Sequence, residues 1–145
     1  MSGTRRRYSH RRNADDVKVA LVLALQRLGI GAQVEVVMKG FYGRFRVDVA
    51  VLNGKRQVLI VAEAKRRPSE LQIRQRTNYA NCGCPALLVL PKTVDMVAAV
   101  IWSYVVDGTP PLRAFLIDNR TFAGGDVIGH PYFGKKALEA RMVRG

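Results

Sequence analysis

The chain has 145 residues, 48% of them hydrophobic, so it can bury one core of useful size and is neither a disordered nor a fibrous protein. Its 24 lysines and arginines against 11 aspartates and glutamates give a formal net charge of +13. Such an excess costs self-repulsion unless a polyanion neutralises it, and nucleic-acid phosphate is the usual polyanion. A ribosome-associated or generally adhesive basic protein is the alternative that charge alone leaves open.

The N-terminal residues 1–12 are basic and lack the apolar stretch of a signal peptide. The longest apolar segments, around 17–28 and 94–106, are too short or too polar to span a bilayer. We therefore expect a cytoplasmic protein without a membrane partner. Cys82 and Cys84 fit that compartment. Because they are one residue apart and have no nearby Cys or His to complete a zinc site, we expect them to be structural.

The first predicted elements are a flexible basic arm and a helix. Residues 1–12 contain five arginines and no acid, which is typical of a mobile arm. Asn13 is the expected N-cap of the helix, because Asp15 and Asp16 then occupy the first turn, where the helix dipole favours acids. Apolar residues recur at helical spacing after them, and Gly29 supplies the stop.

Three strands are expected next, over Gln33–Lys39, Arg44–Leu52 and Gln57–Lys65, with a hairpin signal at Asn53-Gly54. The third strand is more apolar than the others, with five apolar residues over 58–62, as in a strand buried on both faces. Along the second strand, strict alternation predicts one apolar and one polar face: Phe45, Val47, Val49 and Val51 against Arg44, Arg46 and Asp48.

The second half of the chain predicts further helices and strands. Ser69 and Gln72 have capping-box spacing for a helix that runs to about Asn81. Ala86–Leu90 follows that helix and is expected to return as a parallel strand. The remaining expected elements are a helix over 93–105, a strand over 113–118 and, within an otherwise unassigned tail over 123–145, a short helix over 135–142. The predicted fold is an α/β domain over 13–122, with a mixed sheet flanked by helices.

Asp48, Glu63 and Lys65 are the candidate chemical groups. Glu63 and Lys65 share a strand face because they are two residues apart. They follow five apolar residues, which places charge at the end of a buried strand. Buried charge is costly unless it is paired or binds a metal. Ordinary solvated charge on an exposed strand is the alternative interpretation.

The connection between the second and third strands decides whether Asp48 joins the other two. A two-residue turn at Asn53-Gly54 would place Asp48 opposite Leu59, about 13 Å along the strand from Glu63 and too far to share a metal ion. A longer turn or a bulge would bring the two carboxylates opposite or diagonal to each other, within roughly 5–8 Å. The metal interpretation therefore predicts a connection wider than two residues.

Two carboxylates suit a hard divalent cation, most naturally Mg²⁺ or Mn²⁺. Such an ion polarises a phosphoryl oxygen, activates water and stabilises the charge of in-line displacement. Lys65 would orient or help deprotonate the attacking water and offset phosphate charge. The expected metal ligands are Asp48, Glu63 and a backbone carbonyl, that of Ala64 or its neighbour Ala62.

Two strand sequences resemble the signature of the PD-(D/E)XK, or restriction-endonuclease-like, nuclease superfamily: Arg46-Val47-Asp48-Val49 and Val61-Ala62-Glu63-Ala64-Lys65. In the following helix, Gln75-Arg76-Thr77-Asn78-Tyr79 is similar to the Q-x-x-x-Y motif of the RecB-like and type I restriction branches. The resemblance spans residues 13–105. It implies a restriction-endonuclease-like core and a Mg²⁺-dependent nuclease that hydrolyses DNA phosphodiester bonds.

The resemblance also implies site residues. Asp48, Glu63 and Lys65 would be catalytic, and Gln75 and Tyr79 would lie beside them, where relatives contact metal-bound water or nucleic acid.

Two positions depart from the family pattern. Val47 stands where the family name has proline, and the first helix has no glutamate to act as an extra metal ligand. Glu35, on the first strand, is a candidate additional acid, and the number of metal ions stays open.

Arginines around these motifs are candidate nucleic-acid contacts: Arg44, Arg46, Arg66, Arg67, Arg74 and Arg76. Within the preferred function, a stand-alone deoxyribonuclease, a structure-specific endonuclease of the Holliday-junction-resolvase type is an alternative, and that type acts as a homodimer. A basic module that binds nucleic acid without cleaving it is the alternative of another class. DNA is favoured over RNA by the resemblance alone.

Overall fold

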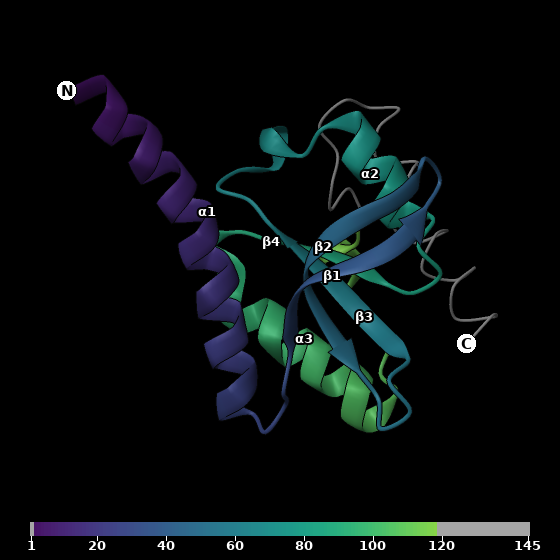
Figure 1. Ribbon diagram of the computed structural model, residues 1–145. Helices are drawn as coiled ribbons and strands as arrows, with labels where there is room; N and C mark the ends of the chain where they lie inside the picture. The colour runs from purple at the N-terminus through teal and green to yellow at the C-terminus, as the bar shows by residue number, and fades with distance from the viewer. Residues whose placement is uncertain (1, 119–145) are drawn as a thin grey trace.

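The computed structural model describes the backbone of residues 2–118 and the side chains of residues 14–118. Its helices and strands are α1 (Ser2–Arg27), β1 (Gln33–Gly40), β2 (Gly43–Leu52), β3 (Val58–Ala64), α2 (Ile73–Ala80), β4 (Ala86–Val89) and α3 (Val94–Asp107). The four strands form one mixed sheet in the order β1-β2-β3-β4, in which only β3 and β4 run parallel (Figure 1). The predicted α/β class, the mixed sheet and the parallel return of β4 are confirmed.

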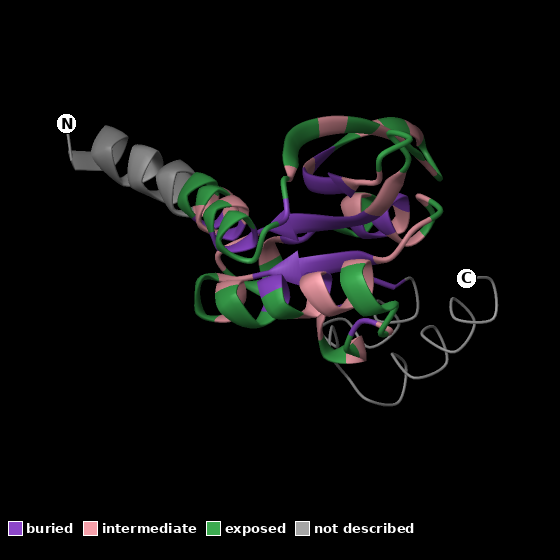
Figure 2. Ribbon diagram, turned by 90° about the horizontal axis from the view of Figure 1, so that it is seen from below, coloured by how far each residue is buried: buried purple, intermediate pink, exposed green. Residues whose placement is uncertain are grey.

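Helices cover both faces of the sheet. The apolar side of α1, with Leu21 and Leu25, packs with α3 against one face of the central strands. The other face carries a second cluster around Tyr79 of α2 and Leu71. β3 lies between the two clusters, and five of its seven residues are buried, as its apolar run over 58–62 predicts. Buried residues gather in the strands at the centre of the molecule (Figure 2). No helix among residues 2–118 has the length and apolar character to cross a membrane.

The helix starts differ from prediction. α1 begins at Ser2, so Asn13 is not its N-cap, and the basic segment predicted as an arm continues the helix backbone from Ser2 onward. Gly29 does end the helix, with φ of +83°. The predicted Ser69 cap is also wrong, because Pro68–Glu70 forms a separate 3₁₀ turn and the capping box of α2 uses Gln72 and Gln75.

The strand predicted over 113–118 is mostly wrong. Residues Arg113–Phe115 form a 3₁₀ turn, and only Leu116 bridges to β4, at Leu87. The Ile117 N–H donates to the Ala86 carbonyl at 2.8 Å, and Leu116 and Ile117 are buried. Burial of these two side chains therefore produced the apolar signal without a strand. The tail over 123–145, including the helix predicted over 135–142, lies outside the described residues.

β2 does not keep strict alternation. Phe45 and Val47 pack on the α2 side, whereas Val49 and Val51 pack on the α1–α3 side. The change of face occurs at Asp48. In the register of β1 with β2, Glu35 lies next to Asp48 and has φ of +56°. A residue in this left-handed conformation disturbs the side-chain alternation of a strand pair and bends the two strands. The half of the hairpin between this position and the tip therefore curves over α2.

The tip of the β1–β2 hairpin is fixed to α2 by Asn78. The Tyr42 N–H donates to the Asn78 side-chain oxygen Oδ1 at 2.8 Å. A Cβ added to Gly40 would lie 2.7 Å from that oxygen and 2.8 Å from the Asn78 Cα. Only glycine permits this close approach of strand and helix backbone.

We expect Gly40→Ala to destabilise the fold by about 1–3 kcal/mol, because the added methyl group must push β1 away from α2. Gly54→Ala is the matched control, since a Cβ there meets nothing within 4 Å and Gly54 has no positive φ. Its effect should stay within about 0.5 kcal/mol. Urea unfolding followed by circular dichroism measures both. Equal stability of the two variants would contradict the close contact between Gly40 and Asn78.

Candidate active site

The connection between β2 and β3 is wider than a two-residue turn. The Asn53 N–H donates to the Gln57 carbonyl at 2.9 Å, which leaves three residues between them, and Arg56 has φ of +64°. The Asn53 side-chain oxygen accepts the N–H groups of Lys55 and Gln57, each at 2.9 Å. Asn53-Gly54 therefore lies in the turn between β2 and β3, as predicted. The hydrogen bonds of the Asn53 side chain stabilise a three-residue loop in place of a two-residue turn.

A bulge beside this loop sets the final register. Pairing shifts between Val51 and Leu52, after which Val49 lies opposite Ala62. Continued by one residue, this register places Asp48 opposite Glu63. The wider connection on which the metal interpretation depends is therefore present, and the 13 Å separation expected from a two-residue turn does not apply.

Asp48 is anchored to both neighbouring elements. Its carboxylate oxygen Oδ2 accepts the Ala64 N–H of β3 at 2.8 Å. Its own N–H donates to the hydroxyl oxygen of Tyr79 on α2 at 3.3 Å. These two bonds fix the position of Asp48 beside the end of β3.

Glu63 is the most enclosed charged group of the site, with 4% of its surface exposed. The Tyr79 hydroxyl donates to one carboxylate oxygen, Oε1. The other oxygen, Oε2, lies 3.4 Å from the Gln75 amide nitrogen and 3.4 Å from the Lys65 ammonium. We call Asp48, Glu63, Lys65, Gln75 and Tyr79 the Glu63 cluster.

The Glu63 cluster explains the Q-x-x-x-Y spacing in physical terms. Gln75 and Tyr79 are four residues apart on α2, so both side chains leave the same helix face and reach Glu63. Phe45 packs edge-on against the Tyr79 ring, with ring centroids 5.0 Å apart, and holds it in place. All five side chains predicted for the centre of the site therefore meet.

Burial makes the negative charge of Glu63 expensive. The pKa of Glu63 is raised from 4.5 to about 8, chiefly by desolvation and next by the nearby charge of Asp48, against the lowering effects of Tyr79 and Lys65. Burial, followed by the charge of Glu63, raises the pKa of Tyr79 well above 10. Tyr79 therefore stays protonated and acts as a hydrogen-bond donor.

The donor set fits a divalent cation that keeps several waters. Asp48 and Glu63 lie together, and a cation beside them would offset the cost of placing two carboxylates in a buried site. Among residues 14–118, no group of three or more His, Cys, Asp or Glu side chains is arranged around one metal position. Glu35 is exposed and lies 3.9 Å from the Lys18 ammonium, in an ion pair with α1. The site thus offers two carboxylates, and Mg²⁺ is commonly held by one or two protein carboxylates together with several waters.

Five of the six predicted arginine contacts are accessible. Arg44, Arg46, Arg67 and Arg74 are exposed, and Arg66 is half-buried. Arg76 is the exception, with 5% of its surface exposed and its Nε donating to the Leu71 carbonyl at 2.9 Å. Arg76 therefore joins α2 to the segment before it and is not a surface contact.

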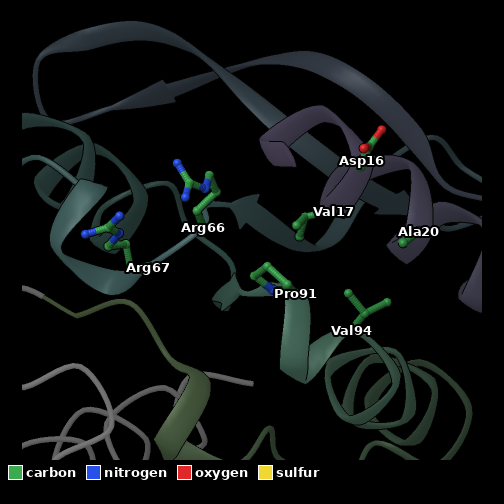
Figure 3. Close-up of a pocket in the computed structure, with 7 residues that line it drawn as sticks. All are labelled: Asp16, Val17, Ala20, Arg66, Arg67, Pro91 and Val94. Atoms are coloured by element: carbon green, nitrogen blue, oxygen red, sulfur yellow. The ribbon is translucent and has the colours of Figure 1, made fainter. Parts of the chain in front are cut away.

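A hollow of about 530 Å³ lies at the carboxyl ends of β3 and β4 (Figure 3). Its lining residues are Asp16, Val17, Ala20, Arg66, Arg67, Pro91 and Val94. The Arg66 nitrogen Nη1 is buried and has no hydrogen-bond partner within the described part of the chain. Sequence reasoning missed this hollow, because only the fold brings the start of α3 and the side of α1 next to Arg66.

The two cysteines lie partly buried against the α2-side core. Their sulfurs are 3.8 Å apart and form no disulfide.

No protein-family model, curated protein or solved structure matches the chain. The functional assignment therefore depends on the geometry and chemistry of the site.

The pKa of Glu63 predicts a pH-dependent stability in metal-free protein. Because the folded-state pKa, about 8, exceeds the ordinary value of 4.5, the folded state holds a proton that the unfolded state loses. Stability is full below pH 4.5 and falls as the pH rises through 8. Each unit of pKa difference corresponds to about 1.4 kcal/mol, so the loss should reach a few kcal/mol.

Urea unfolding with a chelator at pH 5 and pH 9 measures this loss. Glu63→Gln, which is neutral at both pH values, should lack this component. If wild type and Glu63→Gln show the same difference between the two pH values, the described burial of Glu63 is wrong.

Proposed function

We propose that the chain is a divalent-metal-dependent nuclease that hydrolyses DNA phosphodiester bonds. The observation that carries the proposal is the Glu63 cluster, in which a buried carboxylate and Asp48 lie together beside Lys65. A structural ion pair would not explain a second carboxylate next to the buried one, because the like charge of the second carboxylate adds to the free-energy cost of burial. A bound cation would offset that cost.

A Mg²⁺ or Mn²⁺ ion at this position would supply a more acidic water and a counter-charge for the phosphoryl group. Asp48 and Glu63 would hold it, with the backbone carbonyl of Ala64 as a further ligand. Asp48 is positioned by the Ala64 N–H, and Glu63 by Tyr79 and Gln75. The protein therefore fixes both carboxylates before any substrate arrives, which is the preorganisation that catalysis requires.

Lys65 has the position of a group that handles water and phosphate. Its ammonium lies 3.4 Å from Glu63 Oε2, and its side chain keeps 19% of its surface exposed. It can therefore face both the carboxylate and an incoming phosphate. We assign it the orientation of the attacking water and the neutralisation of phosphoryl charge.

The substrate assignment to DNA comes from charge and from the resemblance to the PD-(D/E)XK superfamily. A net charge of +13 favours a polyanion. The order of the elements, with three antiparallel strands, a helix and a parallel fourth strand, supports a restriction-endonuclease-like core. We also propose that the chain belongs to this superfamily, that its substrate is DNA and that it acts in the cytoplasm.

We expect cleavage of labelled DNA with Mg²⁺ or Mn²⁺ and none with a chelator. Glu63→Gln, Asp48→Asn and Lys65→Ala should each lower the rate by about 10²-fold or more, because each removes a positioned charge from the reacting centre. Asp107→Asn, an exposed acid at the end of α3, is the control and should cleave normally.

Linear duplex, single-stranded, circular and four-way-junction DNA should be compared in the same assay. Preference for the junction would select a resolvase-type enzyme. Tight binding with no cleavage of any substrate by either metal would contradict the proposal and favour a module that only binds nucleic acid.

A further inference from the structure

Two aromatic side chains project into solvent at the tip of the β1–β2 hairpin. Phe41 has 66% of its surface exposed and Tyr42 has 47%. Their rings pack edge-to-face with centroids 4.9 Å apart. The Arg74 guanidinium of α2 lies 4.5 Å from the Tyr42 ring centroid, over its face. Exposed aromatic rings beside a guanidinium form the kind of surface on which nucleotide bases stack.

The tip is held rigidly relative to the Glu63 cluster. Asn78 accepts the Tyr42 N–H and packs directly against Gly40. Asn78 precedes Tyr79 on α2, so the same short helix anchors both the hairpin tip and Glu63. Asp48 lies six positions after Tyr42, which corresponds to at most roughly 20 Å of extended chain. A DNA strand could therefore contact both places at once.

The outer face of this hairpin is basic. Lys39 lies directly opposite Arg44, and Arg46 lies opposite Val37. All four of these side chains are exposed. Like charges opposite each other, as in Lys39 and Arg44, destabilise a strand pair. No carboxylate within residues 14–118 forms an ion pair with Lys39, Arg44 or Arg46. A phosphate backbone along this face would remove the repulsion.

We propose that the hairpin tip, through Phe41 and Tyr42, is a binding site for unpaired bases of single-stranded DNA, with the backbone of that strand along Lys39, Arg44 and Arg46. The inference rests on the proposed nuclease function, because it names the form of DNA that the site receives. Bases in a duplex are stacked on each other and present only their edges. Phe41 therefore selects single strands and frayed ends over intact duplex.

Binding of a fluorescent oligothymidine and of a blunt duplex, measured by anisotropy in a chelator, tests the site without cleavage. Phe41→Ala should weaken single-strand binding about tenfold and change duplex binding less than about twofold, because one stacked base is lost. Phe41→Trp should keep single-strand binding. Leu112→Ala is the matched control, since Leu112 is a comparably exposed apolar residue, at 56%, outside the hairpin.

Arg46→Gln should weaken binding of both DNA forms and lower the slope of affinity against salt concentration by about one phosphate contact. Circular dichroism and urea unfolding of each variant show whether its fold is intact. Loss of single-strand and duplex binding to the same extent in Phe41→Ala, or unchanged binding of both, would overturn the proposed base-stacking site.

The two proposals can fail separately. Metal-dependent cleavage by a wild-type protein whose binding ignores Phe41 would remove the stacking site and leave the nuclease. Selective loss of single-strand binding in Phe41→Ala, with no cleavage by wild type, would keep the stacking site and remove the nuclease.

Discussion

The candidate active site is organised around one buried carboxylate, that of Glu63, placed beside a second carboxylate, that of Asp48. Glu63 is removed from water at the end of an apolar strand, and the negative charge of Asp48 lies next to it. Left alone, this arrangement would carry a large desolvation cost. The surrounding contacts offset part of it, since Tyr79 donates to one oxygen while Lys65 and Gln75 approach the other.

Several features of the fold serve this arrangement. The loop after Asn53 and the bulge beside it set the register that brings Asp48 level with Glu63. The reversal of side-chain direction at Asp48 turns the outer hairpin over α2, where Asn78 fixes it. The helix that supplies Gln75 and Tyr79 is thereby held between the sheet and the hairpin.

The core of the site could be predicted from the sequence because its signals are local. Strand parity joins Glu63 to Lys65, and helix periodicity joins Gln75 to Tyr79. The register of β2 with β3 could not be decided, because the side chain of Asn53 replaces the two-residue turn with a longer loop. Tertiary contacts also account for the burial of Arg76, whose Nε donates to the Leu71 carbonyl.

Two further differences lie outside the site. The helical pattern after Asn13 was correct, but it did not reveal that the helix backbone extends to Ser2. The apolar residues over 113–118 predicted a strand, whereas Leu116 and Ile117 are buried in the two core clusters and join β4 through one bridge and one backbone hydrogen bond. A buried side chain gives the same hydrophobic signal whether or not its backbone joins a ladder.

Diffraction from crystals of the protein soaked in Mn²⁺, collected with anomalous scattering at the manganese edge, tests directly whether Asp48 and Glu63 hold a divalent cation. We expect an anomalous peak about 2 Å from carboxylate oxygens of both Asp48 and Glu63, and no such peak in Glu63→Gln crystals. No peak at these carboxylates at a Mn²⁺ concentration that supports DNA cleavage would contradict it.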